Sequence, residues 1–413
     1  GYMYLNDISS PSELSPFPQR EIAGETEDLG AGLPPHPFPQ PEDIDSYLTH
    51  LEDACPVITA DPLEAAEIGA RYLIGDEIGS GAIGQVIEAF DAHLGRTVAI
   101  KILHGGAGVS RERLARFIAE AQITAQLEHP AVVPVHEIGR MPGGMPYFTM
   151  KRIRGESLED IINHLRVGDE WYRRRYTGKP AIRIFFRLCQ GVAYAHDRGV
   201  VHRDLKPSNI LIGEYGEVQI MDWGLAKILS DSPLRKDIGP VRTVRDAPDL
   251  ASIEGAIAGT PAYMSPEQAR GDSAAVGKAS DVYSLGLMLA EFITLVRVFR
   301  NPGQEATLMQ VRTAGEVNLA DLNPNMRVDP ELAFIVRQCT QPDPRLRYPD
   351  AGHLAEDLRC YLEDRQLPIA PDLSARRVIK WSRRNPMLFG ALAASAIIIA
   401  TEIICYLVWL ALR

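Results

Sequence analysis

The eight residues from His202 to Asn209 read His-Arg-Asp-Leu-Lys-Pro-Ser-Asn. They bring a carboxylate, an ammonium group and an amide into one short segment. The pattern before this segment, from Gly155 onward, is mostly helical, and apolar runs near Ile210 and Val218 after it indicate short strands. We therefore interpret the segment as a polar loop in a helical half of the protein, and we expect it to carry catalytic groups.

The residues before Gly155 show a different pattern, in which apolar and polar residues alternate. Such alternation is typical of β-strands, because successive side chains point to opposite faces of a sheet. The stretch Arg111–Glu128 instead has apolar residues at helical spacing. A sheet followed by helices predicts an α+β fold with two unlike lobes and a cleft between them. The expected strands are Tyr72–Ile78, Gln85–Phe90, Thr97–Leu103, Val132–Ile138 and Tyr147–Ile153.

A glycine-rich segment, Gly-Ser-Gly-Ala-Ile-Gly-Gln-Val, runs from Gly79 to Val86 between the first two expected strands. Glycines lack a Cβ, so backbone N–H groups can approach phosphate oxygens closely. The motif alone is weak, because GxGxxG also marks dinucleotide-binding folds and, taken singly, fits a structural hairpin. In dinucleotide-binding folds the glycines open a helix, whereas here a strand is expected to continue to Phe90.

The third expected strand contains a lysine in the run Val-Ala-Ile-Lys, which ends at Lys101. A buried lysine is costly unless an anion lies beside it. A phosphate group and a carboxylate on a helix would serve, and Glu120 lies in the middle of the expected helix among apolar neighbours. Glu112 and Glu128 are the alternatives, but they lie near the helix ends, where side chains are expected to be solvated.

Five motifs follow one another along the chain: the glycine-rich segment, Val-Ala-Ile-Lys, His-Arg-Asp, Asp-Trp-Gly at 222–224 and Ser-Pro-Glu at 265–267. In this order they resemble the signature of the eukaryotic-like (Hanks-type) protein kinases, over about residues 72–364. With the basic segment and apolar stretch that follow, the chain is similar to bacterial membrane-anchored receptor-type kinases. The resemblance implies a bilobal kinase fold, with a β-rich N-lobe at 72–150 and a helical C-lobe at 154–364. It also implies phosphorylation of Ser and Thr rather than Tyr, from Lys206 and Thr260.

The resemblance assigns roles to individual residues. Asp204 is expected to orient the substrate hydroxyl and accept its proton, Lys206 to neutralise the γ-phosphate of ATP, and Thr260 to meet both beneath the acceptor. Asn209 and Asp222 are expected to bind Mg²⁺, or Mn²⁺, because hard cations prefer oxygen ligands. The residues expected at the nucleotide are Gly79, Ser80, Gly81, Gly84, Val86, Ala99, Lys101, Glu120, Met150, Leu211 and the backbone of Ile153.

Structural anchors of the family are also expected. Glu267 should pair with Arg347, and Asp281 should brace the backbone of the catalytic loop. Three positions depart from the family pattern without removing a catalytic group: Trp223, where phenylalanine is usual, Ser265, where alanine is usual, and Lys151, where an acidic residue is common.

The segment between residues 222 and 267 is long and rich in charged and turn-forming residues, so by resemblance it is the activation loop. Because Arg203 precedes the catalytic aspartate, a phosphorylated loop residue is expected to dock on it. Ser252 and Thr243 are the candidates, and Glu254 would offer a permanent negative charge instead. Autophosphorylation of this loop is the expected means of activation.

Composition limits the remaining possibilities. The chain has 413 residues and a net charge of −11, and its first 70 residues hold 14 Asp or Glu and one Arg. The rest is almost balanced in charge, so no nucleic acid partner is expected. The five cysteines are scattered without a CxxC pair, so neither a zinc site nor a disulfide framework is expected. Residues 1–65, acidic and rich in proline, are expected to be a disordered arm, either a tether or a docking segment for proline-recognising modules.

Residues 387–412 form an apolar run interrupted chiefly by Ser395, Thr401 and Glu402. About 20 such residues suffice to cross the ~30 Å hydrocarbon layer of a membrane. The linker at 365–386 is basic, which favours a cytoplasmic kinase domain. We expect a single-pass anchor in the cell (inner) membrane rather than a buried helix. Glu402 is costly in a bilayer, so it pairs across an oligomer or the true span is shifted.

Together these features predict an active, membrane-tethered Ser/Thr kinase. Its expected cofactors are ATP and Mg²⁺, and its expected partners are protein substrates, membrane lipid around the C-terminal helix and, in a homodimer, a second copy of the chain. A pseudokinase scaffold is one alternative, and a kinase-fold enzyme acting on a small molecule is another. A pseudokinase usually lacks the lysine or the metal-binding aspartate, and both are present here.

Overall fold

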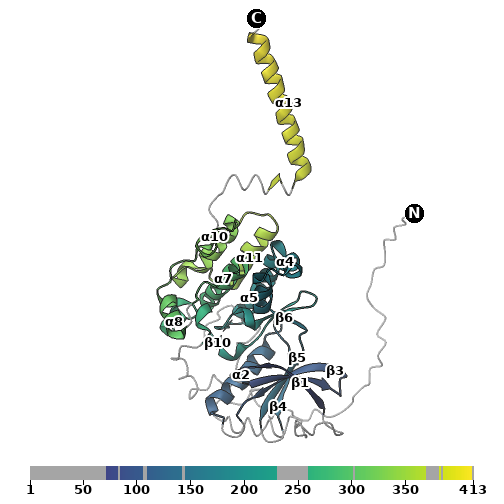
Figure 1. The fold of residues 1–413 in the computed structure, drawn as a ribbon, viewed down its shortest axis with the longest axis vertical. Coiled ribbons are helices and arrows are strands. Elements are labelled where there is room, and N and C mark those ends of the chain that lie inside the picture. The colour runs from purple at the N-terminus through teal and green to yellow at the C-terminus, as the bar shows by residue number, and fades with distance from the viewer. Residues whose placement is uncertain are drawn as a thin grey trace, which may run out of the picture. The chain divides into compact units, whose positions relative to one another are not determined.

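The structure is a computed structural model that describes residues 71–81, 84–105, 109–141, 145–229, 259–300, 303–368, 381–382 and 385–411. Strands gather in the first part of the described chain and helices in the second, as Figure 1 shows. The predicted α+β division into a β-rich and a helical lobe is therefore confirmed.

The N-terminal lobe is a five-stranded antiparallel sheet with the strand order β1-β2-β3-β5-β4. Its strands are β1 (Tyr72–Ser80), β2 (Gly84–Asp91), β3 (Arg96–Leu103), β4 (Val135–Arg140) and β5 (Pro146–Lys151). Strand β4 begins later than predicted, because Pro134 has no N–H to donate to the sheet. Val132 makes only an isolated parallel bridge to Ile220.

Strand β3 separates the two apolar layers of this lobe. Val98, Ile100 and Ile102 are buried in one cluster, whereas Ala99 and Leu103 are buried in another. The second cluster includes Phe117 and Ala121 of helix α2 (Arg111–Gln126), which begins after its N-cap Ser110. Lys101 alternates with the first set, so its side chain lies on the face of the sheet that α2 covers.

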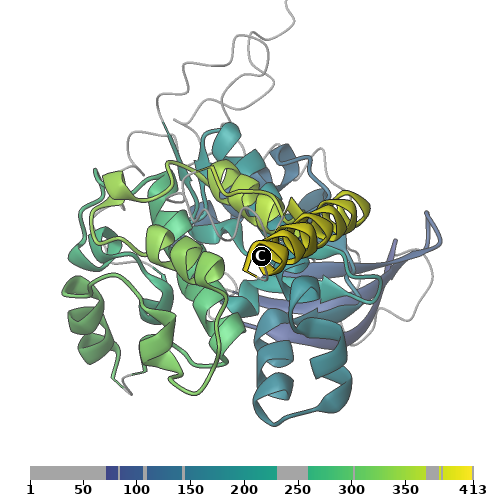
Figure 2. The same ribbon diagram turned by 90° about the horizontal axis from the view of Figure 1, so that it is seen from above.

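The C-terminal lobe is built around helices that pack side by side and share one large apolar core (Figure 2). Its helices are α3 (Leu158–Arg166), α4 (Glu170–Tyr176), α5 (Lys179–Asp197), α6 (Pro266–Arg270), α7 (Lys278–Thr294), α8 (Gln304–Arg312), α9 (Leu319–Leu322), α10 (Pro330–Cys339) and α11 (Ala351–Leu362). Helix α7 is buried over almost its whole length.

Short strands hold the segment from His202 to Asn209 between these helices. Strand β7 (Val200–Val201) precedes it and pairs with β10 (Lys227–Ile228). Strand β8 (Ile210–Gly213) follows it and lies between β6 (Gly155–Ser157) and β9 (Val218–Ile220). The polar segment is thus a loop, as the sequence predicts, and sheet hydrogen bonds fix both of its ends.

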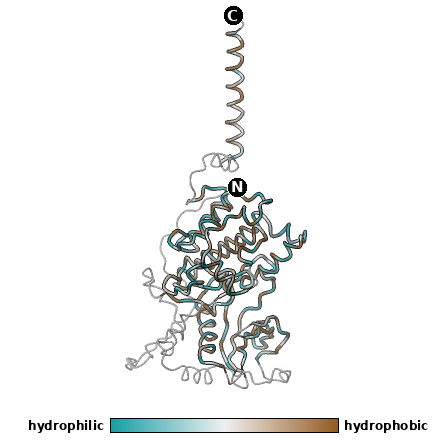
Figure 3. Tube along the Cα trace, turned by 60° about the vertical axis from the view of Figure 1, so that its left-hand side comes forward, coloured by the Kyte–Doolittle hydropathy of each residue, from teal (hydrophilic) through white to brown (hydrophobic). Residues whose placement is uncertain are grey.

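Helix α13 (Pro386–Ala411) contributes no residue to the apolar clusters and is not buried. It is the one helix in the described part of the chain that is long and apolar enough to cross a membrane. Apolar colouring predominates along it in Figure 3, and large side chains such as Leu392, Ile397 and Leu407 are exposed. It begins one residue before the run expected from the sequence.

The predicted ion pair between Glu267 and Arg347 is present and lies in the core of the C-terminal lobe. The two nitrogens Nη1 and Nη2 of Arg347 donate to the two carboxylate oxygens of Glu267 at 2.7 and 2.9 Å. Both side chains are at most 1% exposed. Arg347 also donates to the carbonyl oxygens of Ala279, Gln341 and Pro342, so the pair ties α6 to the first turn of α7 and to the segment after α10.

Arg347→Met should lower the free energy of unfolding by about 3–5 kcal/mol, because it leaves the buried carboxylate of Glu267 without its counter-charge. Chemical denaturation of the full chain in detergent measures the change. The matched control is Arg345→Met, which removes a solvent-exposed pair with Asp343 and should leave the midpoint unchanged. Equal effects of the two substitutions would contradict the structural role given to the buried pair.

Candidate active site

The catalytic-loop backbone is fixed by one buried carboxylate, that of Asp281 on helix α7. The N–H of His202 donates to Oδ2 of Asp281 at 2.8 Å, and the N–H of Arg203 donates to Oδ1 at 2.9 Å. The ring of His196 lies 2.9 Å from the same carboxylate. Burial alone would raise the pKa of Asp281, but the hydrogen bond and charge of His196, and the backbone N–H of Arg203, lower it. Asp281 therefore stays ionised and braces the loop.

Arg203 turns the chain at the start of the loop. Its φ of 69° lies in the left-handed region, which non-glycine residues seldom adopt. The Arg203 carbonyl accepts a hydrogen bond of 2.8 Å from Nε2 of Gln268, the third residue of α6. Sequence reasoning did not single out Gln268, although it directly follows the Ser-Pro-Glu motif at 265–267.

Three of the predicted catalytic residues converge on one point. Lys206 Nζ donates to Asp204 Oδ2 at 2.7 Å and to Thr260 Oγ1 at 3.0 Å. The N–H of Thr260 donates to Asp204 Oδ1 at 2.7 Å. Asn209 Nδ2 donates to the carbonyl of Asp204 at 2.9 Å, so the amide is oriented by the loop itself. Residues 204 and 260, far apart in sequence, thus form one polar cluster of defined geometry.

A second cluster links the two lobes through Lys101. Its Nζ lies 2.5 Å from Glu120 Oε1 on α2 and 3.9 Å from Asp222 Oδ1. Burial opposes the charged form of the lysine, but the two carboxylates outweigh it and raise the pKa of Lys101. The ammonium group is therefore charged, and the prediction that Glu120 would be its helix partner is confirmed.

The Asp-Trp-Gly segment follows the left-handed turn at Asp222, whose φ is 62°. Trp223 is 1% exposed and its ring lies 4.6 Å from that of His202. A Cβ on Gly224 would lie 3.2 Å from Glu120 Oε2, so this glycine lets the segment approach α2 closely. The bulkier Trp223 is accommodated in the core of the C-terminal lobe, and Asp222 keeps its carboxylate beside Lys101.

The residues predicted to line the adenine slot form one apolar group. Ala99, Met150 and Ile153 are buried members of the cluster between the sheet and α2, and Val86 and Leu211 pack against it. Leu211 comes from β8 in the C-terminal lobe, so the group includes residues of both lobes. An apolar site of this kind suits a flat aromatic base.

The glycine-rich segment lies at the end of β1 and the start of β2. A Cβ on Gly84 would lie 2.2 Å from the carbonyl oxygen of Ile102, so only glycine fits at that position. Nothing lies within 4 Å of a Cβ built on Gly79, and Ser80 is exposed. The backbone of Gly79 and Gly81 is thus open on one side, which is the geometry that an approaching phosphate group requires.

The side-chain oxygen atoms at this site can hold a divalent cation only together with oxygen atoms from a bound ligand. Among the described residues, no cluster of three or more His, Cys, Asp or Glu side chains is placed to hold a metal ion. Mg²⁺ is usually held by one or two carboxylates plus phosphate oxygens and water. The half-exposed carboxylate of Asp222 and the amide oxygen of Asn209, whose nitrogen is already engaged, are hard ligands of that kind. The donor set fits Mg²⁺.

The predicted regulatory residues Ser252 and Thr243, and the alternative Glu254, lie outside the described residues. The same holds for the acidic arm at 1–65. Arg203, on which a phosphorylated residue is expected to dock, is described and half-buried.

Residues 72–357 match the family model of the protein kinase domain. The match covers well over half of the chain, and the chain belongs to the protein kinase domain family. Members of this family generally use ATP and a divalent metal ion and act on proteins.

The chain is also similar to three bacterial proteins named serine/threonine-protein kinase PknD. It is 35% identical to that of Protochlamydia amoebophila over 299 residues, which are 71% of this chain and 30% of that protein. It is 34% identical to that of Chlamydia caviae over 299 residues, 71% of this chain and 31% of that protein. It is 32% identical to that of Chlamydia trachomatis serovar D over 339 residues, which are 79% of this chain and 36% of that protein. The chain spans about a third of the length of these relatives.

Asp281→Asn should destabilise the chain at neutral pH, because an amide cannot accept all the hydrogen bonds that the carboxylate receives. A carboxylate with a lowered pKa stabilises the fold above its unfolded pKa, near 3.8, and the contribution is lost as the pH falls through the folded pKa. The difference in melting temperature between wild type and variant should therefore shrink as the pH is lowered below about 4. The exposed Asp197→Asn is the control, and a difference that grows on acidification would contradict the assignment.

Proposed function

We propose that this chain is an ATP-dependent protein kinase that transfers the γ-phosphoryl group of ATP to Ser and Thr hydroxyls of proteins. One observation carries the proposal: Asp204, Lys206 and Thr260 form a hydrogen-bonded cluster at the catalytic loop. The family to which the chain belongs, and its similarity to proteins named serine/threonine-protein kinases, support the same activity.

In the proposed reaction, Asp204 orients the acceptor hydroxyl and takes its proton. A bond forms between the hydroxyl oxygen and the γ-phosphorus, and the bond from that phosphorus to the β–γ bridging oxygen breaks. Lys206 compensates the negative charge that spreads over the phosphoryl oxygens, and Lys101, held by Glu120, binds the α and β phosphates. Asn209 and Asp222 would hold the metal ion, which when bound would neutralise charge at the phosphates. Positioning and electrostatics account for the chemistry.

The acceptor preference rests on Thr260. Its hydroxyl and backbone N–H are both engaged by the catalytic loop, so the segment after it begins directly beside Asp204. This contact of Thr260 with Lys206 and Asp204 supports Ser and Thr as the proposed acceptors.

The pseudokinase alternative has no support from the residues present. Lys101, Glu120, Asp204, Asn209 and Asp222 are all retained: Lys101 pairs with Glu120 and lies near Asp222, and Asn209 donates to the carbonyl of Asp204. A scaffold without chemistry would not need this set of contacts.

Asp204→Asn should reduce phosphoryl transfer by at least about 100-fold, because the amide can no longer take up the hydroxyl proton. Transfer of radioactive phosphate from ATP to a generic protein substrate, followed by analysis of the phosphorylated amino acids, measures both rate and acceptor. The matched control is Asp197→Asn, at an exposed position at the end of α5. Undiminished transfer by Asp204→Asn, or phosphotyrosine as the main product, would contradict the proposal.

We further propose that α13 anchors the kinase domain to the cell (inner) membrane as a single span, with the domain on the cytoplasmic side. The length and apolar surface of α13 support this. Arg376, Arg377 and Lys380 precede it, and the preference of basic residues for the cytoplasmic side gives the orientation. The lipid chains surround the helix, and two copies of the chain side by side would allow the Glu402 side chains to pair.

The division of the chain follows from this proposal: an N-terminal arm at 1–65, a kinase domain at 72–364, a basic linker at 365–386 and the span at 387–412. Phosphorylation of Ser252 or Thr243 in the activation loop, with docking on Arg203, is the proposed means of activation.

Deletion of residues 386–413 should move the chain from the membrane fraction to the soluble fraction, because it removes the apolar surface that lipid covers. Cell fractionation with an antibody to the kinase domain measures the shift. A variant in which α13 is replaced by an unrelated Leu-Ala helix of equal length should stay in the membrane. A deletion variant that remains membrane-bound after washing with high salt would contradict the anchor.

A further inference from the structure

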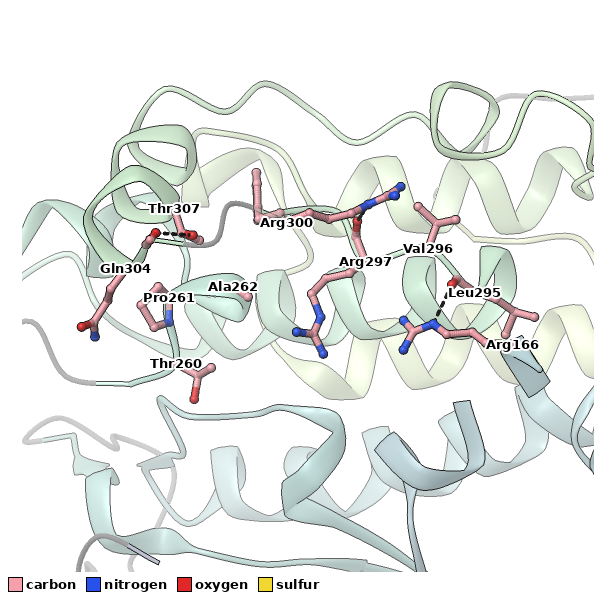
Figure 4. Close-up of a pocket in the computed structure, with 12 residues that line it drawn as sticks. Arg166, Thr260, Pro261, Ala262, Leu295, Val296, Arg297, Arg300, Gln304 and Thr307 are labelled. Carbon is pink, nitrogen blue, oxygen red and sulfur yellow. Dashed lines mark hydrogen bonds between the residues drawn. The ribbon is translucent and has the colours of Figure 1, made fainter. Parts of the chain in front are cut away.

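A pocket in the C-terminal lobe opens beside the proposed acceptor site and takes no part in the chemistry described above. Its volume is about 590 Å³. Figure 4 shows that its walls come from the end of α3, the segment after Thr260, the loop that follows α7 and the first turns of α8. The residues that line it are Arg166, Thr260, Pro261, Ala262, Leu295, Val296, Arg297, Phe299, Arg300, Gly303, Gln304 and Thr307.

Thr260 belongs to both the pocket and the acceptor site. Its N–H donates to Asp204 and its hydroxyl accepts from Lys206, and it also forms one end of the pocket wall. A protein segment whose hydroxyl lies at Asp204 must therefore pass the pocket mouth. An extended chain advances about 3.3–3.6 Å per residue, so side chains within about four residues of the acceptor can reach it.

The walls of the pocket carry positive charge. The twelve lining residues include three arginines and no aspartate or glutamate. The pocket also takes in Gly303 and Gln304 at the start of α8, where a helix carries partial positive charge. The charge of these walls favours an anion.

Two glutamates pair with the arginines of the pocket: Glu159 Oε1 accepts a hydrogen bond of 3.2 Å from Arg297 Nη2, and Glu291 lies behind the walls with its carboxylate already engaged. Glu291 is 1% exposed and accepts hydrogen bonds of 2.5 Å from Arg166 Nη2 and from the hydroxyl of Tyr263. Arg297 Nε lies 3.5 Å from it. Burial and the charge of Glu291 raise the pKa of Tyr263, so the phenol keeps its proton and remains a donor. Glu291 fixes the arginines in place and is shielded from a cationic ligand.

The arginines are held in position before any ligand binds. Arg166 Nε donates to the carbonyl of Leu295 at 2.9 Å, and the guanidinium carbon of Arg297 lies 5.6 Å from the centre of the Tyr263 ring. In Figure 4 the side chains of Arg166 and Arg297 extend toward the same space. Arg300 is anchored through Nε to the carbonyl of Arg297 at 2.7 Å. Its two terminal nitrogens make no hydrogen bond or ion pair with any residue that the structure describes.

We propose that this pocket binds an acidic or phosphorylated side chain of the protein substrate, close in sequence to the Ser or Thr that is phosphorylated. Arg300 supplies the available guanidinium, and Arg297 and Arg166 supply the surrounding positive charge. Planar guanidinium groups match the paired oxygens of carboxylates and phosphates. The proposal rests on the proposed kinase activity and names the class of substrate that the site selects.

The test uses the full chain in detergent and peptides with one Ser acceptor. One series carries a single Asp at successive positions up to about four residues before and after the acceptor, with Ala elsewhere. A second series carries phosphoserine, with the acceptor replaced by Thr, and a third carries Lys. At one position, or two adjacent positions, kcat/KM should exceed that of the all-Ala peptide by about tenfold for Asp or phosphoserine. The comparison between Asp and phosphoserine shows which anion the pocket prefers.

Arg300→Gln should reduce the ratio of kcat/KM between the acidic and the all-Ala peptide to about one. Both peptides are measured on the same preparation, so a loss of folded enzyme cancels from the ratio. Arg300→Glu should reverse the preference toward the Lys peptide. The matched control is Arg183→Gln, at an exposed position on α5, which should keep the preference of the wild type.

The outcomes separate the two proposals. Equal kcat/KM for acidic and all-Ala peptides by an enzyme that phosphorylates them overturns the pocket assignment and leaves the kinase activity standing. A preference for acidic peptides that survives in both Arg300 variants overturns it as well, because the selectivity would then come from another surface. Failure of the wild type to phosphorylate any peptide or protein, or activity equal to that of Asp204→Asn, overturns the kinase proposal and this inference with it.

Discussion

The carboxylate of Asp281 is a charge buried in the middle of the largest apolar core of the protein, and the geometry of the catalytic loop depends on it. A buried carboxylate without partners would cost several kcal/mol. Here each oxygen is used: one accepts from the backbone of Arg203, and the other accepts from the backbone of His202 and lies beside the ring of His196. Because Asp281 binds backbone N–H groups rather than side chains, the backbone conformation of the loop does not depend on the contacts of its polar side chains. The hydrogen-bonded cluster of Asp204, Lys206 and Thr260 can form only on a backbone held in this way.

A few contacts around Lys101 and Glu120 also join the two lobes. Strand β3 buries Ala99 and Leu103 against α2, and the alternation of a strand then directs Lys101 to the same side. Glu120 projects from α2 to meet it, while its second oxygen lies over Gly224. That oxygen has no hydrogen-bond partner among the described residues, so the pair depends on Lys101 and on close packing. A shift of α2 would separate Lys101 from Glu120 and free the Asp-Trp-Gly segment together, which couples the position of the helix to the proposed metal site.

Much of this arrangement follows from local sequence patterns. The alternation of apolar and polar residues predicted strand β3 and the side of the sheet on which Lys101 lies. The position of Glu120 in the middle of its helix predicted that it is the partner of Lys101. The pairs of Glu267 with Arg347 and of Asp281 with the loop came from the family resemblance, since nothing local marks them. The boundary of β4 was missed because Pro134 removes a donor from a run that otherwise alternates. Gln268 and the contacts of Glu291 were missed for another reason: Arg166 and Glu291 are separated by 125 positions, and no local pattern connects them. Long-range polar contacts of this kind are decided by the packing of helices, which a single sequence does not display.

The catalytic loop and the pocket lined by Arg166, Arg297 and Arg300 both begin near residues with a left-handed backbone. Among the described residues, four that are not glycine have a left-handed backbone: Arg203, Asp222, Leu295 and Asp364. Each such conformation costs on the order of 1 kcal/mol or more, so it persists only where surrounding contacts enforce it. Arg203 starts the catalytic loop, Asp222 starts the Asp-Trp-Gly segment, and Leu295 ends α7 and starts the loop that carries Arg297 and Arg300. The carbonyl of Leu295 is held by Arg166, just as the carbonyl of Arg203 is held by Gln268. Three of the four turns thus begin segments that the proposed reaction or the proposed pocket uses, and the third has no role in phosphoryl transfer. Because Arg166 holds the turn at Leu295, the segment with Arg297 and Arg300 leaves α7 in a fixed direction, and a fixed direction favours a pocket that selects one charged side chain.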